Sequence, residues 1–413
     1  MKILMVDKYH FIKGGAERYV FELAKVLEAN GHEVIHFSMQ DERNFPSEYE
    51  EYFINNINYN QNGFKKITNG LSAVSKMFFS LEAQKKLEQL IKKTGPEIAH
   101  VHMIDHQLSP SILYTLKKYK IPVIQTVHQY KLVCPNYKLY NPRTNQICEK
   151  CMDKRYIHAA LERCHKNSFV ASLLLSFEMY FHKFFQMYEK NIDLFHVPSR
   201  FMGAKLEQGG INPERIKHLF YTINVDDFKF HPDFESYFVY FGRLSKEKGI
   251  LTLLKALRKI DNCRLKIIGD GPEEGFLKQY VAENKLKNVE FVGKLEGQDL
   301  LDSVSKAMFI VVPSEWFDNS PLVIYEAFAM GKPVIGSRAG GISELIDDGD
   351  NGFLFEMGNA HELEEKIRHL LQHPELVKKF SHSARAKAMK FFSPDQHYKK
   401  MLSFYKHLVN GSN

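Results

Sequence analysis

The sequence predicts an α/β protein with two doubly wound, parallel sheets, each in its own domain. Its 413 residues exceed one compact domain at roughly 150 residues per domain, so two or three domains are expected. Short apolar strands alternate with amphipathic helices in two separate series, as in parallel sheets with helical crossovers. Hydrophobic residues make up 44% of the chain, which is enough to build large cores and excludes an intrinsically disordered protein.

The first series begins with a strand, a helix and a second strand. The helix is predicted from Ala16, because apolar residues then recur at i, i+3, i+4 and i+7, and Gly31 ends it. After four strands, Cys134–Arg200 interrupts the alternation and is interpreted as an insertion, with its cysteine-rich part at about 134–165. The strands expected in this series are Met1–Val6, His32–Ser38, Glu97–His102 and Pro122–His128.

The second series is more regular, and a predicted linker at Tyr221–Glu235 precedes it. The predicted domains are residues 1–225 and 226–394, followed by a C-terminal segment at residues 395–413. Two such sheets facing each other would hold a ligand in a cleft at the carboxyl ends of their strands. The expected strands are Tyr237–Phe241, Arg264–Ile268, Val289–Val292, Met308–Val312 and Lys332–Gly336.

Charge is distributed unevenly between the two domains. The net charge is +7, yet residues 1–225 hold 30 basic and 22 acidic side chains, whereas residues 226–394 hold 23 and 26. The first domain is therefore expected to meet an anionic partner or membrane surface, and nucleic acid is excluded because no recognition motif is present. No apolar run reaches the roughly 20 residues of a membrane span, and the starting MKILMV has the pattern of a buried strand. A cytoplasmic protein is expected.

Two common nucleotide-binding signatures do not fit. The run Gly269-Asp270-Gly271-Pro272-Glu273-Glu274-Gly275 has Glu274 where the dinucleotide fingerprint requires its third glycine. No Walker A sequence occurs in the chain. Hydride transfer and ATP hydrolysis therefore lose support.

Two other loops, each following a strand of the second series, suit a diphosphate. In Gly242–Gly249, Arg243 and Lys248 supply cations and the glycines let the backbone approach a ligand. The alternative for this loop is a solvated basic turn before a helix.

In the second loop, Pro321 suits a first helical turn, so the N–H groups that follow it can bind anionic oxygens. Glu326 lies further along this helix, where its carboxylate can accept hydrogen bonds from paired hydroxyls such as those of a ribose. The alternatives are a helix N-cap for Asp318 and an exposed helical charge for Glu326.

Together these loops resemble those of the retaining, nucleotide-sugar-dependent glycosyltransferases of family 4, which have the GT-B fold of two Rossmann-like domains facing a central cleft. The motifs that carry the resemblance are FGRLSKEKG, IIGDGP, VEFVGKL, VVPSEWFDNSPLVIYEAFAMGKPVIGS, and GGISELI followed by NGFLF. The resemblance implies transfer of a sugar from a UDP- or GDP-sugar to a glycan or lipid-linked glycan, in cell-surface polysaccharide biosynthesis. It further implies that residues 1–225 face the acceptor, that 226–394 bind the donor, and that 395–413 pack back on the first domain.

The resemblance also implies roles for single residues. Arg243 and Lys248 would act at the donor diphosphate, and Asp318 and Glu326 would hold the donor sugar and ribose. Asp318 departs from the family pattern, in which this residue is usually Glu, so its reach to the sugar is one methylene shorter. Further donor-binding residues implied are Gly14, Gly15, Gly269, Gly271, Pro272, Val292, Gly293, Lys294, Ser320, Pro321, Leu322 and Val323.

His128 follows Thr126 and Val127 at a predicted strand end, and in similar enzymes a histidine here touches the donor sugar beside the reacting carbon. A structural histidine is the alternative, and His102 is a weaker candidate.

The resemblance implies transfer with retention and without an active-site metal or other cofactor. It implies that cations and helix N-termini stabilise the leaving diphosphate. A nucleotide-sugar epimerase of related fold, or a non-catalytic nucleotide-sugar-binding subunit of a glycan assembly complex, stays open.

Four of the five cysteines gather in one stretch. Cys148 and Cys151 form a chelating C-x-x-C pair, and Cys134 and Cys164 flank it across spacers of 13 and 12 residues. One interpretation is a structural zinc site with four thiolates. The other is four buried thiols in a reducing cytosol.

Two stretches are candidates for contact with an anionic membrane on its cytoplasmic side, as a lipid-linked acceptor would require. Asn58–Lys93 holds seven lysines with Phe64, Phe78 and Phe79 between them, and Phe169–Tyr188 is rich in aromatic residues. The alternative is a solvated basic face for the first and a buried core helix for the second.

Overall fold

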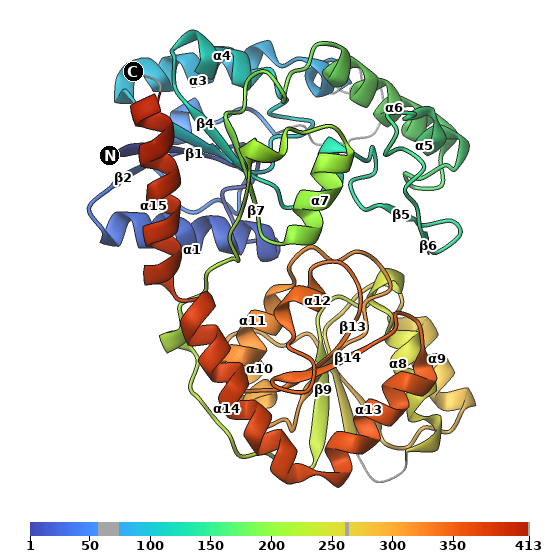
Figure 1. Ribbon diagram of the computed structural model, residues 1–413. Coiled ribbons are helices and arrows are strands. Elements are labelled where there is room, and N and C mark those ends of the chain that lie inside the picture. Colours follow the sequence, from blue (N-terminus) through green and yellow to red (C-terminus); the bar gives the residue numbers. More distant parts are fainter. Residues whose placement is uncertain (57–73, 261–263, 412–413) are drawn as a thin grey trace. The chain divides into compact units, whose positions relative to one another are not determined.

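The computed structural model describes residues 1–56, 74–260 and 264–411, and they form two compact units (Figure 1). Unit 1 comprises Met1–Arg143, Cys148–Thr222 and His397–Asn413. Unit 2 comprises Thr144–Ile147 and Ile223–Gln396. Among the described helices, none combines the length and the hydropathy needed to cross a membrane.

Unit 1 contains a parallel sheet of six strands in the order β2-β1-β3-β4-β7-β8. Most of its strand residues are buried, because helices cover a parallel sheet on both faces. The bounds are β1 Lys2–Val6, β2 Glu33–Phe37, β3 Ile98–Val101, β4 Val123–Thr126, β7 Leu194–Val197 and β8 Ile216–His218.

The sequence prediction was wrong about the end of the insertion. Strand β7 lies inside the stretch Cys134–Arg200, yet it pairs with β4 on one side and β8 on the other. The apolar run of β7 is only four residues long, so the long aromatic segment before it hid the return to the alternating pattern. Between β4 and β7 lie the short strands β5 (Tyr140–Asn141) and β6 (Gln146–Ile147) and helices α5 and α6.

The helices of unit 1 include one from the C-terminus of the chain, α15, which belongs to this unit from His397 onward. Its side chains bond to a residue just before β2 and to a residue of β3: Tyr398 Oη lies 2.9 Å from His32 Nε2, and Tyr405 Oη lies 2.6 Å from His100 Nδ1. The helix bounds are α1 Gly15–Ala29, α3 Leu81–Thr94, α4 Ile112–Lys118, α5 Ile157–Leu161, α6 Phe169–Phe184, α7 Arg200–Gln208 and α15 Pro394–Gly411.

Unit 2 contains a second parallel sheet of six strands, in the order β11-β10-β9-β12-β13-β14. The strand order reverses between β9 and β12, and open parallel sheets commonly bind ligands at such a point, beyond the carboxyl ends of the strands. The prediction of two parallel α/β sheets is confirmed, and β9 and β10 have the predicted bounds. The bounds are β9 Tyr237–Phe241, β10 Arg264–Ile268, β11 Val289–Gly293, β12 Ile310–Val312, β13 Val334–Ser337 and β14 Gly352–Phe355.

Helices on both faces of this sheet bury a large apolar core in which Phe238 and Phe309 stack with ring centroids 4.9 Å apart. The helices are α8 Ile250–Ala256, α9 Glu274–Glu283, α10 Gly297–Ser305, α11 Leu322–Ala329, α12 Ile342–Leu345, α13 Ala360–Gln372 and α14 Pro374–Phe391.

Candidate active site

Glycines let the loops after β9, β10 and β11 pack directly against one another in unit 2. Gly269 has a φ of 140°, and a Cβ on it would stand 2.0 Å from the carbonyl oxygen of Gly242. A Cβ on Gly271 would stand 2.3 Å from the carbonyl oxygen of Leu244, whose own N–H donates to Asp270 O at 2.7 Å. The predicted donor-binding glycines therefore lie at one edge of the sheet, at the carboxyl ends of its strands.

The loop after β12 is joined to the loop after β9 across the point where the strand order reverses. Gly249 has a φ of 68°, and a Cβ on it would stand 1.9 Å from the carbonyl oxygen of Pro313. The N–H of Glu315 donates to Glu247 O at 2.8 Å. Both contacts bring the backbones of the two loops close together, and at residue 249 only glycine permits this approach.

This junction brings two of the predicted site residues together. Lys248 Nζ lies 2.5 Å from Asp318 Oδ2, and Ser314 Oγ donates to the same oxygen at 3.3 Å. The Lys248 ammonium also lies 5.4 Å from the centre of the Trp316 ring, whereas Arg243 is exposed at the start of the loop. Lys248 is therefore paired within unit 2, and its role at a diphosphate stays a prediction.

Helix α11 places Glu326 inside unit 2. The helix begins at Leu322, and Pro321, rather than Asp318, occupies the N-cap position. The N-cap interpretation of Asp318 is therefore wrong. Glu326 is only 7% exposed, so the interpretation of an exposed helical charge is also wrong. Just before the helix, Ser320 Oγ lies 2.5 Å from Tyr325 Oη, which fixes the hydroxyl of a predicted donor-binding residue.

The remaining predicted donor residues of unit 2 lie after β10 and at the end of β11. Pro272 follows Gly271 in the loop after β10, and Val292 and Gly293 are the last residues of β11. Lys294 is exposed, and its ammonium lies 2.5 Å from Glu296 Oε1.

In unit 1, helix α1 begins at Gly15 with Gly14 as its N-cap. Behind this glycine turn lie two buried carboxyl groups, Asp7 and Glu17, which the sequence interpretation had not considered. Burial, and secondarily the charge of Glu17, raises the pKa of Asp7 to about 8. Asp7 follows β1 directly, and its position at a strand end is the signal that could have identified it.

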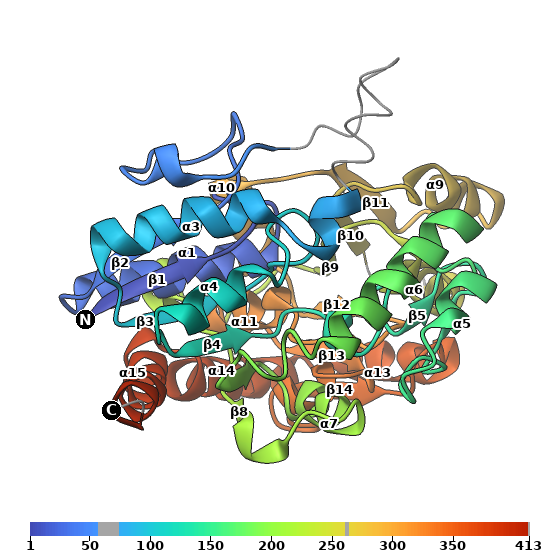
Figure 2. The ribbon, with the colours of Figure 1, turned by 90° about the horizontal axis from the view of Figure 1, so that it is seen from above.

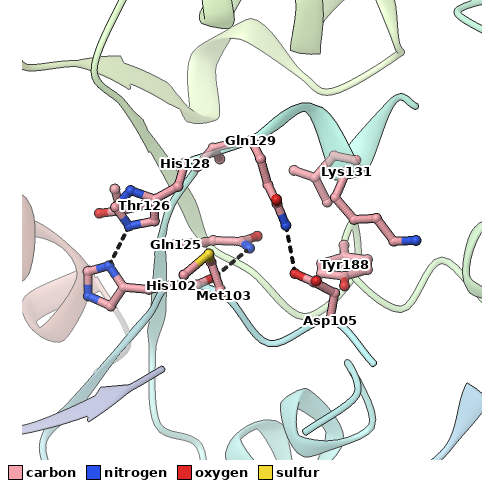
Figure 3. Close-up of a pocket in the computed structure, with 11 residues that line it drawn as sticks. His102, Met103, Asp105, Gln125, Thr126, His128, Gln129, Lys131 and Tyr188 are labelled. Carbon is pink, nitrogen blue, oxygen red and sulfur yellow. Dashed lines mark hydrogen bonds between the residues drawn. The ribbon is translucent and has the colours of Figure 1, made fainter. Parts of the chain in front are cut away.

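His128 lies two residues beyond β4 rather than at its end, and it lines a small pocket with His102, Asp105 and Gln129 (Figure 3). Its Nε2 lies 3.0 Å from His102 Nδ1, and its Nδ1 lies 2.7 Å from Tyr221 Oη. Burial lowers the pKa of His128 to about 3 and lowers that of His102 as well. Both imidazoles are therefore neutral at physiological pH.

The hydrogen-bond partners fix which ring nitrogen carries each proton. His102 Nε2 lies 2.9 Å from the Met5 sulfur, which can only accept, so this nitrogen donates. His102 Nδ1 must then accept from His128 Nε2, and His128 Nδ1 must accept from the hydroxyl of Tyr221. His128 is thus a neutral, oriented ring rather than a general base.

A second directional chain runs through the sheet behind this pocket. His196 Nε2 donates to Leu219 O at 2.7 Å, so His196 Nδ1 accepts from the Thr126 hydroxyl at 2.8 Å. Thr126 Oγ1 then accepts from His100 Nε2, and His100 Nδ1 accepts from Tyr405 of helix α15, both at 2.6 Å. His100 is therefore a structural residue.

The pocket also contains a network of charges that the sequence interpretation missed. Lys8 Nζ lies 3.1 Å from Asp105 Oδ2, and Gln129 Nε2 donates to Asp105 Oδ1 at 3.0 Å. Lys131 Nζ lies 2.6 Å from Glu178 Oε2, and both side chains are buried. Although burial opposes it, Lys8 holds the pKa of Asp105 below its usual value. Asp105 and Gln129 follow β3 and β4, so their positions after strands could have identified them.

The four cysteines of the predicted zinc site lie in unit 1 and line one small cavity, and none forms a disulfide. Burial raises the pKa of Cys134 and raises that of Cys164 to about 12. Across the described residues, no group of three or more His, Cys, Asp or Glu side chains has the arrangement of a metal site.

The two predicted membrane-contact stretches differ in the structure. Residues 58–73, including Phe64, lie outside the described residues. In the rest of the first stretch, α3 buries its apolar residues after Leu81, which is itself 72% exposed, and it exposes lysines, so it has a solvated basic face. Helix α6 in the second stretch is not a buried core helix, because Phe177 is 57% exposed and Phe184 is 82% exposed.

The chain is similar to known glycosyltransferases over nearly its whole length. Residues 13–226 match the family model "Glycosyltransferase Family 4", and residues 224–387 match "Glycosyl transferases group 1". An uncharacterized glycosyltransferase of Methanocaldococcus jannaschii is 26% identical over 95% of this chain and 94% of its own. A GDP-mannose-dependent alpha-mannosyltransferase of Corynebacterium glutamicum is 33% identical over 39% of this chain and 40% of its own.

A solved structure has the same fold. Anabaena HepE in complex with UDP-glucose superposes with a TM-score of 0.69, at 18% identity, over 99% of this chain and 100% of its own. The fold is therefore GT-B. Since one family model covers more than half of the chain and a second covers most of the rest, the chain belongs to glycosyltransferase family 4 and is an enzyme that transfers a sugar from a nucleotide-sugar donor.

Proposed function

We propose that this enzyme is a retaining glycosyltransferase that moves a sugar from a UDP- or GDP-sugar to a lipid-linked glycan at an anionic membrane surface, in cell-surface polysaccharide biosynthesis. The observation that carries the donor assignment is the junction of the loops after β9 and β12. There the Lys248 and Asp318 side chains meet at 2.5 Å, where the strand order of unit 2 reverses. HepE binds UDP-glucose and the C. glutamicum relative depends on GDP-mannose, which supports a UDP- or GDP-sugar as donor here.

In this proposal, unit 2 holds the donor through its diphosphate, ribose and sugar. Arg243 is exposed and can reach the diphosphate, and Lys248 adds a second cation whose position Asp318 fixes. Asp318 is one methylene shorter than glutamate, so it holds Lys248 while presenting its other carboxylate oxygen to the donor sugar. Glu326, one turn into α11, accepts hydrogen bonds from the ribose hydroxyls.

The chemical step depends on stabilising the leaving diphosphate. Negative charge grows there as the bond to the sugar breaks, and fixed cations and helix N-termini stabilise it without having to reorganise. A leaving phosphate oxygen accepts the acceptor's proton on the same face of the sugar, which gives retention without a protein base. His128 contributes as an oriented neutral ring beside the sugar, because its pKa of about 3 excludes a cation there.

Helices α5 and α6 of unit 1 support a membrane-associated acceptor. They lie side by side (Figure 2), and their segment exposes several large apolar side chains, which we call the apolar face. Arg155, Arg163 and Lys166 are exposed in the same segment, as expected for contact with anionic lipid. The apolar face comprises Ile157, Leu161, Phe169, Val170, Phe177, Tyr180, Phe184 and Phe185.

Replacing Phe177 and Phe184 together with serine is expected to weaken binding to anionic vesicles at least tenfold. Burying one aromatic ring contributes about 1.5 kcal/mol or more, and each 1.4 kcal/mol is a factor of about ten. Flotation with phosphatidylglycerol-containing vesicles measures the bound fraction. The control is Phe276→Ser, which removes a ring of similar exposure from unit 2. If the wild-type chain binds neither anionic nor neutral vesicles, the result would favour a soluble acceptor.

The donor assignment is tested by incubating the chain with a panel of UDP- and GDP-sugars and a membrane lipid extract. Mass spectrometry is expected to find one donor whose sugar moves to a lipid-soluble product or, without acceptor, is slowly hydrolysed. Conversion of a donor into its epimer, with no transfer, would contradict the proposal.

A further inference from the structure

The four cysteines of unit 1 line a different cavity from His128 and His102, and the transfer reaction gives them no role. Cys134 follows the 3-10 helix Tyr130–Leu132, Cys148 follows β6, Cys151 lies in the next turn, and Cys164 follows α5. Four separate positions of the chain thus bring a thiol to one cavity, which Asn136, Tyr140, His158 and Ala159 complete.

Backbone N–H groups close to two of these sulfurs favour the thiolate. Those of Leu139, Asn136 and Lys138 lower the pKa of Cys134, and that of Ala159 lowers the pKa of Cys151, although burial has the larger, opposite effect. The main acceptors of the Lys138 and Ala159 N–H groups are Asn136 Oδ1 at 3.1 Å and Tyr156 O at 3.0 Å. A thiol is only a weak acceptor, whereas a thiolate accepts such hydrogen bonds strongly. Donors of this kind orient metal-bound thiolates in known sites. The backbone is therefore suited to the ionised form of these cysteines.

The segment around the cysteines combines an irregular backbone with a small apolar cluster. Of the twelve described non-glycine residues with positive φ, seven lie between Tyr137 and Asn167, and such conformations cost of order 1–3 kcal/mol each unless the surroundings enforce them. The apolar cluster under the segment has only five members, Cys151, Tyr156, Ala159, Cys164 and Met179. Segments with so small a core are commonly stabilised by a disulfide or a metal ion.

We propose that Cys134, Cys148, Cys151 and Cys164 bind one structural Zn²⁺ as four thiolates. Binding releases four protons, and zinc supplies the tetrahedral centre that the C-x-x-C pair and its two flanking cysteines can complete. The thiol of Cys134 now donates to Asn136 Oδ1 at 2.9 Å, and it gives up this bond as the four side chains turn toward the metal. Lys150 lies close enough to Cys148 and Cys164 to offset part of the resulting negative charge.

The zinc would stabilise the residues that hold α5 and α6, the helices that carry the apolar face. Met179 of α6 and Tyr156 share the apolar cluster with two of the cysteines, and Ser176 of α6 donates to Tyr156 O at 2.8 Å. Asn141 and Arg143, before Cys148, both bond to Glu162, two residues before Cys164. Release of the metal is therefore expected to loosen α5 and α6 together, while unit 2 keeps its structure.

Elemental analysis of the purified full chain, after dialysis against metal-free buffer, is expected to find one zinc per chain. Modification of the thiols with a mercurial reagent should release this zinc to a colorimetric chelator, and hydrogen exchange should then rise in residues 134–184. Cobalt-substituted protein should show a thiolate-to-metal charge-transfer band and the visible spectrum of a tetrahedral site. Cys148→Ser removes a proposed direct ligand of the metal. Loss of an outer-shell partner weakens metal affinity roughly 10- to 100-fold, so this variant should weaken metal retention at least that much. The matched control is Cys263→Ser, which removes the fifth cysteine of the chain.

Several outcomes would overturn the proposal, and the wild-type measurements decide it even if Cys148→Ser fails to fold. Metal-free protein with four thiols that react in the native state excludes the site. Two disulfides found by mass spectrometry, or bound iron with visible absorption, excludes zinc. Zinc that leaves without any change in hydrogen exchange shows that the metal does not support α5 and α6. None of these readouts depends on transferase activity.

Discussion

Glu326→Ala is expected to lower the turnover of sugar transfer by roughly 10- to 150-fold while the chain stays folded. In the proposed function Glu326 accepts hydrogen bonds from the donor ribose, and it does so from a side chain that is only 7% exposed. A hydrogen bond to a charged group contributes about 1.5–3 kcal/mol, and each 1.4 kcal/mol is a factor of about ten in rate. The measurement is the rate of product formation with the donor identified by mass spectrometry.

Two further variants make this test specific. Glu326→Gln keeps the shape and one acceptor oxygen, so it should lose less activity than the alanine variant. Glu364→Ala removes a glutamate of α13 whose side chain is 15% exposed and pairs with Arg368, and it should leave turnover unchanged. The fluorescence of Trp316, the single tryptophan of the chain, verifies that unit 2 is folded in each variant. Full turnover in a folded Glu326→Ala chain would contradict the assigned donor site.

Acid is expected to unfold unit 1 before unit 2. Burial lowers the pKa of His128 and His397 to about 3 and that of His196 to about 4, and it also lowers those of His100 and His102. Unfolding restores the ordinary value near 6.5, so the unfolded chain binds more protons as the pH falls below it. Their contribution to stability is therefore lost between about pH 6.5 and the low native values.

The three histidines with the best-defined shifts set the expected magnitude. From pH 6 to pH 5, each costs about 1.2 kcal/mol, hence about 3.5 kcal/mol for His128, His196 and His397 together. Asp7 acts in the opposite direction, because its raised pKa of about 8 makes its contribution grow as the pH falls toward 4. That offset is about 1.4 kcal/mol per pH unit, which leaves a net loss of about 2 kcal/mol from these four groups.

Urea unfolding at pH 7, 6 and 5 measures this loss. Circular dichroism should show an early transition whose midpoint falls steeply with pH, whereas Trp316 fluorescence should report a later transition of unit 2. His361→Asn, at a side chain 72% exposed on α13, should not change the slope. Equal midpoints at pH 7 and pH 5 would show that the buried histidines do not control stability.

Local patterns in the sequence were sufficient to predict much of unit 2. The five apolar residues of β9 and the run of β10 fix those strands regardless of their neighbours. The glycines at 249, 269 and 271 stand where the structure needs close backbone contact, and the role of these loops in donor binding stays a prediction. The pairing of Lys248 with Asp318 was not predictable, because it joins residues 70 positions apart through the order of strands in the sheet.

Unit 1 was harder to predict for a physical reason. Its site consists of buried polar groups whose partners come from distant elements, such as His100 with Tyr405 and Lys131 with Glu178. Nothing near His100 in the sequence distinguishes a structural ring from a functional one. Likewise, the aromatic run of α6 left a membrane-contacting helix and a buried core helix both open, and only the structure reveals that part of the run is exposed.

The hydrogen-bond chain from Tyr405 to Leu219 has a consequence for the order in which the protein folds during synthesis. Its first donor is in α15, which leaves the ribosome only after all of unit 2 has been made. His397, also in α15, bonds to Tyr19 of α1 across 378 positions of sequence. Unit 1 therefore lacks the hydrogen bonds that α15 supplies to its histidines until α15 has been synthesised, whereas residues 223–396 can already form their own sheet. The unit that begins first finishes last, which exposes it longest to chaperones and proteases.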